Sequence, residues 1–326
     1  MSSELVSVVM ATYNGEKYLR QQMSSILEQT HPNFELIVVD DASADKTLSI
    51  LKEFAALDNR IHVVTAEKNM GLVANFERGL KLAKGNFIAL SDQDDIFRKD
   101  KIERLLTELK NQPDRDLVVS DLSLIDENGI EVAQSMWRDQ KLKPKQGKPF
   151  RRLLYRNFAT GCAMMFRRRL LDIAIPFPPD CLVHDWWLSV VATSEKGGGI
   201  CLVNEHLTAY RQHSLNVIGA KTTFALKPNL IVARIKAPPL GISIWMNEIK
   251  LHIARLAGYL KIETWTAHER LMIKKTKETL EGYLSDAHSD IFSRVIKLPQ
   301  RVRCAATTRS ISHCIGTVFV TLWPYK

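Results

Sequence analysis

Residues 88–95 read Ile-Ala-Leu-Ser-Asp-Gln-Asp-Asp, a short apolar run that ends in three carboxylates, Asp92, Asp94 and Asp95. Carboxylates this close raise one another's pKa, so the triplet indicates a divalent metal ion, a Lys or Arg partner, or full solvation. Alternate side chains of an extended segment point the same way, so Asp92 and Asp94 can face one pocket while Asp95 turns aside. Hard carboxylate oxygens suit Mg2+ or Mn2+. The alternative interpretation is a solvated acidic turn before a helix that begins near Arg98.

The sequence before this stretch alternates between strand and helix patterns. Apolar, β-rich runs predict buried strands at residues 5–11, 35–39, 61–65 and 87–90, and helical spacing predicts helices at 16–29, 46–57 and 72–84. This alternation predicts an α/β fold: a doubly wound, Rossmann-like and mostly parallel sheet flanked by helices.

Polar clusters follow three of the four predicted strands. They are Thr12-Tyr13-Asn14-Gly15, Asp40-Asp41 and the acidic triplet. Ligands of such sheets bind beyond the carboxyl ends of the strands, so we expect the clusters to share one edge. The first strand is followed by neither a GxGxxG nor a GxxxxGK[ST] motif, which argues against a nicotinamide or P-loop enzyme.

The later sequence predicts a second half of this domain. A strand is expected at 117–124, a turn at 126–129, a basic loop at 141–152, small residues leading into a strand at 157–166, and a helix from 184 to about 194.

Composition sets the broad class of the protein. The chain has 326 residues, of which 45% are apolar and 25% charged, as in soluble globular proteins. Its 5 cysteines are widely spaced without a CxxC pair, which argues against a disulfide framework or zinc site and fits a reducing cytosol. The first apolar run predicts a strand rather than a signal peptide, and no run approaches the roughly 18 apolar residues of a membrane-spanning helix.

Positive charge is concentrated in residues 221–326. This region has 17 Lys and Arg against 7 Asp and Glu, or +10, so the net charge of +9 leaves −1 for residues 1–220. We predict a basic helical C-terminal region there, because Ile249, Ile253, Leu256 and Leu260 recur at helical spacing. After Asp290 the chain has no acidic residues, and its basic residues lie among apolar ones, which favours contact with an anionic membrane surface. A helical subdomain with a solvated basic face is the alternative, and no nucleic-acid motif accompanies the charge.

Six motifs together resemble the family 2 glycosyltransferases, inverting enzymes of the GT-A fold that use nucleotide diphosphate sugars. In order, they are Val-Ser-Val-Val-Met-Ala-Thr-Tyr-Asn-Gly, Phe-Glu-Leu-Ile-Val-Val-Asp-Asp-Ala-Ser, Asn-Met-Gly, Ala-Leu-Ser-Asp-Gln-Asp-Asp, His-Asp-Trp-Trp and Tyr-Arg-Gln-His. The resemblance covers roughly residues 4–218. It implies a catalytic domain at 1–220, with a nucleotide-binding half at about 1–125 and an acceptor half at about 126–220.

The resemblance also implies roles for the residues of the first half. Thr12, Tyr13, Asn14 and Asp40 match contacts to the nucleobase and ribose, and Asp92 is similar to a ribose contact. Metal ligands are implied at Asp94, with His213 and Asp95 as further candidates; Asp95 is otherwise a supporting residue, and His213 an ordinary surface or core residue. Many members carry an Arg-Asn pair where this chain has Phe76-Glu77, and Arg78 is a weak substitute for that arginine.

In the second half, Asp185 of the His-Asp-Trp-Trp motif matches the family's catalytic base. An inverting transfer needs a carboxylate to take the proton of the acceptor hydroxyl, although Asp185 could instead cap the following helix. Gly161, His184, Trp186 and Trp187 are implied near donor and acceptor, with the core as the alternative place for the two tryptophans.

The implied function is transfer of a sugar with Mn2+ or Mg2+ to a saccharide acceptor, lipid-linked by expectation, in synthesis of a bacterial surface polysaccharide such as O-antigen. The motifs are similar to a rhamnosyltransferase-like branch, so dTDP-L-rhamnose or a UDP-hexose is the expected donor. We expect a cytoplasmic protein, peripheral on the inner face of the plasma membrane. A non-catalytic scaffold that binds nucleotide sugars and a nucleotidyltransferase are the alternatives.

Overall fold

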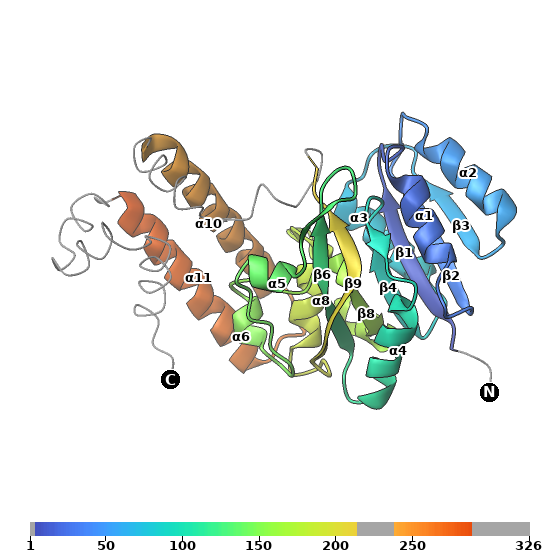
Figure 1. The fold of residues 1–326 in the computed structure, drawn as a ribbon. Helices are drawn as coiled ribbons and strands as arrows, with labels where there is room; N and C mark the ends of the chain where they lie inside the picture. Colours follow the sequence, from blue (N-terminus) through green and yellow to red (C-terminus); the bar gives the residue numbers. More distant parts are fainter. Residues whose placement is uncertain (1–3, 214–237, 289–326) are drawn as a thin grey trace. The chain divides into compact units, whose positions relative to one another are not determined.

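The structure is a computed structural model, and it describes residues 4–213 and 238–288 (Figure 1). The chain forms two compact units. The first contains Met1–Thr222 together with Gly258–Ile273, and the second contains Thr223–Ala257 together with Lys274–Lys326. The segment Gly258–Ile273 therefore belongs with the first unit, whereas the sequence predicts a C-terminal region that begins at residue 221.

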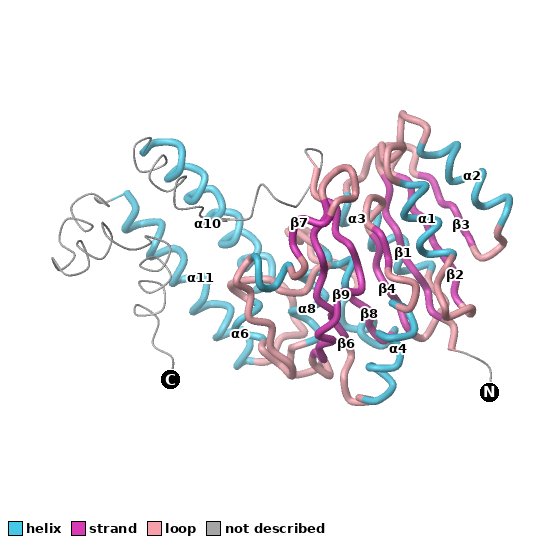
Figure 2. The backbone as a smooth tube through the Cα atoms, in the orientation of Figure 1, coloured by secondary structure: helices cyan, strands magenta, loops and turns pink. Residues whose placement is uncertain are grey.

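A single mixed sheet organises the first unit (Figure 2). Its strand order is β3-β2-β1-β4-β8-β6-β9-β5, and β7 pairs with β6. The strands are β1 Val6–Thr12, β2 Phe34–Asp40, β3 Ile61–Thr65, β4 Phe87–Ser91, β5 Ile96–Phe97, β6 Leu117–Ile125, β7 Glu131–Ala133, β8 Met164–Arg167 and β9 Ile200–Arg211. Strands β1 to β4 pair with one another in parallel, as predicted, whereas β8 runs antiparallel between β4 and β6.

Helices α1 to α3 alternate with strands β1 to β4, as predicted. The helices within residues 4–213 are α1 Leu19–Leu27, α2 Thr47–Leu57, α3 Leu72–Leu82, α4 Lys101–Asn111, α5 Met136–Asp139, α6 Phe150–Leu153, α7 Leu171–Ala174 and α8 His184–Ala192, with the short 3-10 helices η1 Gly161–Ala163 and η2 Arg168–Leu170. The predicted basic loop at 141–152 ends in α6.

Both faces of the sheet are covered. On one face, Val8 and Met10 of β1 belong to one hydrophobic core with buried residues of α1, α2 and α4. On the other face, α3 lies so close to the sheet that a Cβ atom on Gly79 would be 2.5 Å from a methyl group of Val9. Because side chains alternate along a strand, β1 contributes to both cores. The result is the predicted α/β arrangement of helices on both sides of a sheet.

Strand register brings the polar clusters to one edge. Thr12 at the end of β1 pairs with Asp40 at the end of β2, and Met10 pairs with Ser91, the last residue of β4. Strand β9 runs parallel to β6 and ends where Ile125 pairs with Arg211. The residues that follow β1, β2, β4 and β9 therefore meet at a common edge.

Two long helices follow the first 213 residues, α10 Pro238–Leu260 and α11 Ala267–His288. Within the described residues, no helix is both long and apolar enough to cross a membrane. The basic residues after Asp290, on which the predicted membrane contact depends, lie outside the described residues.

Candidate active site

A cavity of about 690 Å³ opens at this edge of the sheet. The loops after β1, β2, β4 and β9, the start of α3, helix η1 and the start of α8 all contribute to its wall. Its lining includes these residues from the sequence prediction: Thr12, Tyr13, Asn14, Asp92, Asp94, Gly161, His184, Asp185 and His213. Residues up to 201 positions apart in the chain thus surround one space.

Asp92, Gln93, Asp94 and Asp95 form the turn after β4, called here the acidic turn, and Gln93 binds the loop after β1. The Gln93 side chain accepts a hydrogen bond from the Tyr13 backbone N–H at 2.9 Å and donates one to the Tyr13 carbonyl at 3.1 Å. A Cβ atom on Gly15 would lie 2.3 Å from the Gln93 Oε1, so a larger residue there would displace the Gln93 side chain. The exposed Tyr13 ring and the acidic turn are therefore held on one wall.

Asp40, the last residue of β2, and Asp41, which follows it, have different surroundings, which corrects the prediction that Asp40 contacts the nucleotide. Asp40 is buried and accepts hydrogen bonds from Thr12 Oγ1 at 2.9 Å and from Ser43, and it does not line the cavity. Asp41 does line the cavity, and it accepts bonds from the backbone N–H groups of Met70 and Gly71. Asp41, to which the sequence analysis gave no separate role, is thus the carboxylate that reaches the cavity from the end of β2.

Asp94 and His213 form a close pair on the cavity wall. Asp94 Oδ2 lies 2.8 Å from His213 Nε2, and the His213 ring packs against Tyr18 with ring centroids 4.9 Å apart. Both side chains are largely shielded, with 14% and 9% of their surface exposed. A carboxylate oxygen and an imidazole nitrogen at this separation are close enough to bind one cation together.

Asp95 points behind the wall and does not line the cavity. Its Oδ1 accepts a hydrogen bond from the Arg211 N–H at 3.0 Å, while the Arg211 guanidinium donates to the Asp94 carbonyl at 2.8 Å. Lys101 is also fully buried nearby and donates to the Cys162 carbonyl. Burial raises the pKa of Asp95 to about 7 and lowers the pKa of Lys101 to about 7. Asp95 and Arg211 thus hold the acidic turn in place through hydrogen bonds on the side away from the cavity.

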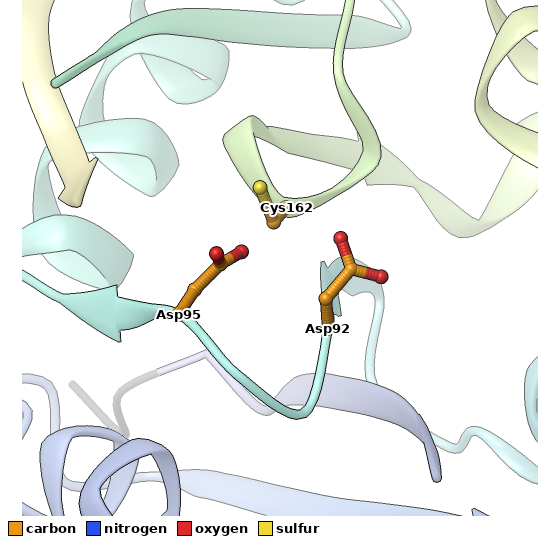
Figure 3. A group of neighbouring side chains, drawn as sticks. All are labelled: Asp92, Asp95 and Cys162. Atoms are coloured by element: carbon orange, nitrogen blue, oxygen red, sulfur yellow. The ribbon is translucent and has the colours of Figure 1, made fainter. Parts of the chain in front are cut away.

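Figure 3 shows Asp92 and Asp95 from the turn after β4, with Cys162 from η1 beside them. One ligand atom from each of the three lies within 4.8 Å of the others. Burial raises the pKa of the Cys162 thiol well above its ordinary value, and burial together with the neighbouring Asp95 and Asp94 does the same for the carboxyl group of Asp92. A protonated thiol is a poor ligand for Mg2+ or Mn2+, so this group fits the metal less well than Asp94 and His213 do.

Asp185 lies at the start of α8 with both carboxylate oxygens engaged. Oδ2 accepts a hydrogen bond from the Gly161 N–H at 2.8 Å, and Oδ1 accepts one from Asn157 Nδ2 at 3.1 Å. Burial, which leaves 8% of the residue exposed, raises the pKa of Asp185 to about 7. A carboxyl group with such a pKa can accept a proton efficiently near neutral pH. The capping alternative does not hold, because the N-cap of α8 is Val183 and Asp185 is the second residue of the helix.

Three side chains on this wall carry buried polar atoms without a protein partner among the described residues, and one of these atoms is the Tyr18 hydroxyl. Both side-chain atoms of Asn75, in the first turn of α3, and both ring nitrogens of His184 have no hydrogen-bond partner among the described residues. The His184 ring stacks on Phe76 with centroids 3.7 Å apart. Burial lowers the pKa of His184 to about 3, so the imidazole is neutral. The sequence interpretation missed Asn75, because an isolated asparagine in a helix carries no signal of its own.

The two tryptophans and Arg78 lie away from the cavity, which corrects the prediction for Trp186 and Trp187. The Trp186 indole donates to the Leu153 carbonyl, and the buried Trp187 donates to the Ala174 carbonyl and packs on Trp265. Trp187 therefore belongs to the buried core, and Trp186 is partly buried. Arg78 donates to the Thr65 carbonyl and does not line the cavity.

The charge balance of the wall is acidic. Among the described lining residues, Asp41, Asp92, Asp94, Glu127 and Asp185 carry carboxyl groups, and Lys17 is the only Lys or Arg. Lys17 is itself paired with Glu127 at 3.0 Å. An anionic ligand in this cavity therefore requires a cation that the described lining does not supply.

Comparison with known sequences identifies the family. The family model for "Glycosyl transferase family 2" matches residues 7–173, about half of the chain. The chain is also 30% identical over 240 residues to "Putative teichuronic acid biosynthesis glycosyltransferase TuaG" of Bacillus subtilis, covering 71% of this chain and 88% of that protein. The chain belongs to glycosyl transferase family 2.

A second family 2 relative has a more detailed name. Over 196 residues the chain is 34% identical to the Escherichia coli "UDP-Glc:alpha-D-GlcNAc-diphosphoundecaprenol beta-1,3-glucosyltransferase WfgD", which covers 59% of this chain and 71% of that protein.

Solved structures show the same fold at low sequence identity. S. aureus TarS 1–349 in complex with UDP-GlcNAc matches with a TM-score of 0.56 and 19% identity, covering 91% of this chain and 77% of that one. The mannosyltransferase PcManGT from Pyrobaculum calidifontis, in complex with GDP-Man and Mn2+, matches with a TM-score of 0.58 and 15% identity, covering 100% and 82%. The predicted GT-A fold of this family 2 chain is thereby confirmed.

Proposed function

We propose that the protein is a metal-dependent, inverting glycosyltransferase that moves a sugar from a nucleotide diphosphate sugar to a saccharide acceptor. The observation that carries this proposal is the presence, in one cavity, of the Asp94 and His213 pair and of Asp185 with a pKa of about 7. The Asp94 and His213 pair can hold a cation at a leaving diphosphate. Asp185 can take the proton of an attacking hydroxyl.

The residues of the wall fit a divalent metal ion. Asp94 and His213 would hold it, and when bound it would neutralise negative charge on the departing diphosphate. The acidic wall supports this assignment, because a diphosphate cannot approach the carboxylates without a counter-charge. The carboxylate ligand suits either Mn2+ or Mg2+, and the complex of PcManGT with Mn2+ supports the same class of ion.

Asp185 is the proposed catalytic base. It removes the proton of the acceptor hydroxyl while that oxygen forms a bond to the anomeric carbon. The bond from this carbon to the diphosphate breaks at the same time, and its electron pair leaves with the diphosphate. Attack from the face opposite the leaving group inverts the anomeric configuration. Gly161 and Asn157 orient the carboxylate through the two hydrogen bonds that it accepts.

The remaining lining residues are assigned to the nucleotide. Thr12, Tyr13, Asn14 and Asp41 lie at the ends of β1 and β2, where the base and ribose are expected in this fold. An aspartate there can accept the imide N–H of uracil or thymine, and we assign this contact to Asp41 in place of Asp40. Asp92 is proposed to contact the ribose.

The donor is proposed to be dTDP-L-rhamnose or a UDP-hexose, and the acceptor a lipid-linked saccharide. The names of TuaG and WfgD, the second of which includes UDP-Glc and diphosphoundecaprenol, support a place in bacterial polysaccharide synthesis. The proposed product is a surface polysaccharide such as O-antigen. We further propose that residues 1–220 are the catalytic domain, and that basic residues of 221–326 hold the protein at the cytoplasmic face of the membrane.

The test is nucleoside diphosphate release by the full chain from UDP-glucose, UDP-GlcNAc and dTDP-L-rhamnose, with a lipid-diphosphate saccharide as acceptor. We expect turnover with Mn2+ and its loss in EDTA. Binding of these donors without turnover in any metal would support the scaffold instead. Release of pyrophosphate from a nucleoside triphosphate and a sugar phosphate would support a nucleotidyltransferase.

A further inference from the structure

The strongest unexplained feature of the cavity is a pair of almost fully buried side chains in which every polar atom lacks a partner among the described residues. Asn75 is 1% exposed and His184 is 3% exposed, and each lines the cavity with two polar atoms that no described residue satisfies. Buried polar groups in native proteins are nearly always paired, and the exceptions mark places where a ligand or water is missing. Four such atoms on one wall therefore indicate a ligand.

Their position selects the part of the ligand that they would meet. His184 directly precedes Asp185, and a Cβ atom on Gly161 would lie 3.0 Å from His184 Nε2 and 3.4 Å from the Asp185 Cβ. The atom that reacts must lie beside Asp185 if Asp185 is the base. Asn75 and His184 thus border the reacting sugar rather than the nucleobase, which lies beside Tyr13 and Asp41 in the proposed function.

The side chains of Asn75 and His184 are uncharged, and each can both donate and accept hydrogen bonds. A carboxamide offers both donors and acceptors, and a neutral imidazole offers one donor and one acceptor. Sugar hydroxyls also donate and accept, so they match both side chains. Phe76 holds the His184 ring by stacking at an interplanar angle of 20°, which fixes the direction of its nitrogens.

The same wall is hostile to a negatively charged sugar. Asp92 and Asp185 lie on it, and the single Lys or Arg among the described lining residues, Lys17, is paired with Glu127. A carboxylate on the sugar ring would lose its hydration and meet carboxyl groups without a cation to offset the cost.

We infer that Asn75 and His184 are specificity-determining residues that bind hydroxyl groups of an uncharged sugar ring and select neutral hexoses or deoxyhexoses against hexuronates. This inference rests on the proposed function, because it assigns the sugar end of the donor site. It goes beyond it by naming the residues and the charge class of the sugar.

The experiment measures binding by isothermal titration calorimetry with Mn2+, using sets matched for nucleotide: UDP, UDP-glucose and UDP-glucuronate, then dTDP and dTDP-L-rhamnose. The wild type should bind at least one neutral nucleotide sugar more tightly than the matching diphosphate. It should bind UDP-glucuronate at least about tenfold more weakly than UDP-glucose if UDP is the nucleotide. Tighter binding of UDP-glucuronate than of the neutral sugars would overturn the inference.

The variants Asn75→Ala and His184→Ala separate the sugar from the nucleotide. Each should weaken binding of the neutral nucleotide sugar about five- to tenfold, as expected for loss of a neutral hydrogen bond, and leave binding of UDP or dTDP within about twofold. His184→Gln keeps an uncharged donor and acceptor and should restore part of the loss. Circular dichroism checks that the variants fold.

Two negative results have different meanings. If both alanine variants weaken UDP or dTDP as much as the nucleotide sugar, Asn75 and His184 do not contact the sugar, and the inference fails while the proposed function stands. If the wild type binds no nucleotide or nucleotide sugar, the proposed function fails and the inference fails with it.

Discussion

Asp94 Oδ2 and His213 Nε2 lie 2.8 Å apart although 119 residues separate them in the chain. Asp94 lies in the turn after β4, and His213 follows β9. The contact exists because β9 runs parallel to β6 and ends at the same edge of the sheet as β4. The fold thus brings an oxygen and a nitrogen ligand together where a diphosphate is expected.

Replacing either member of this pair should weaken metal binding. We expect Asp94→Asn and His213→Ala each to raise the Kd for Mn2+ about tenfold or more, since each removes one ligand from the site. Titration of Mn2+ by electron paramagnetic resonance in the presence of UDP or dTDP measures this. Asp139→Asn, an exposed aspartate outside the cavity, is the matched control. Unchanged Mn2+ affinity in both variants would remove the assignment.

Activity should depend on pH through Asp185. A base acts in its ionised form, and burial raises the pKa of Asp185 to about 7. We therefore expect kcat/KM for the donor to rise about tenfold per pH unit below pH 7 and to level off above it. Initial rates between pH 5.5 and 8.5 at saturating Mn2+ check this. A profile that is flat across this range would contradict a base with this pKa.

The same shift predicts how Asp185→Asn changes stability. A carboxyl group of pKa about 7 in the folded state and roughly 3.9 in the unfolded state holds its proton more tightly when folded. Its contribution to stability is therefore greatest at low pH and is lost as pH rises to about 7. An asparagine does not ionise, so the variant does not lose stability in this way. The Tm of the variant should therefore rise relative to the wild-type Tm between pH 5 and 7.

Between pH 5 and 7, the free energy of unfolding of Asp185→Asn should rise relative to that of the wild type by about 1 kcal/mol per pH unit. Thermal or urea unfolding at each pH measures this difference. Asp139→Asn should show a difference from the wild type that does not change with pH. If Asp185→Asn behaves in the same way as that control, Asp185 has an ordinary pKa in the folded protein.

Gly161→Ala should damage catalysis more than stability. The new Cβ atom would lie 3.0 Å from His184 Nε2 and 3.5 Å from Asp185 Oδ2, so these side chains must move by a few tenths of an ångström. A small displacement of a catalytic group can cost roughly tenfold or more in kcat. We expect that loss with a Tm within a few degrees of the wild type. Full activity in the variant would show that the position tolerates a side chain.

The sequence predicted the part of the fold that repeats a simple pattern. Strands β1 to β4 and helices α1 to α3 follow from apolar runs and helical spacing, because each element is long and strongly patterned. Strand β9 was not predicted, since Asn204, Glu205 and His206 interrupt its apolar residues and its pairing with β6 shifts register near Asp121. The position of β8 between β4 and β6 likewise depends on long-range pairing, which the local sequence pattern does not indicate.

The sequence predicted those site residues whose place in a short motif determines that their side chains face the cavity. Asp92, Asp94, Asp185 and His213 line the cavity, and their motifs named them. The choice between Asp40 and Asp41 depends on whether β2 ends one residue earlier or later, and strand ends are poorly defined in sequence. The unpartnered amide of Asn75 becomes visible only when every possible partner can be located.

The most direct test of the account compares donor binding and turnover in Asp185→Asn. The central claim is that Asp94 and His213 serve the leaving diphosphate while Asp185 serves the acceptor. The variant should therefore bind the donor with Mn2+ within about twofold of the wild-type Kd and lose about 10²- to 10⁴-fold in kcat. Wild-type kcat in this variant, or a loss confined to donor binding, would contradict the claim.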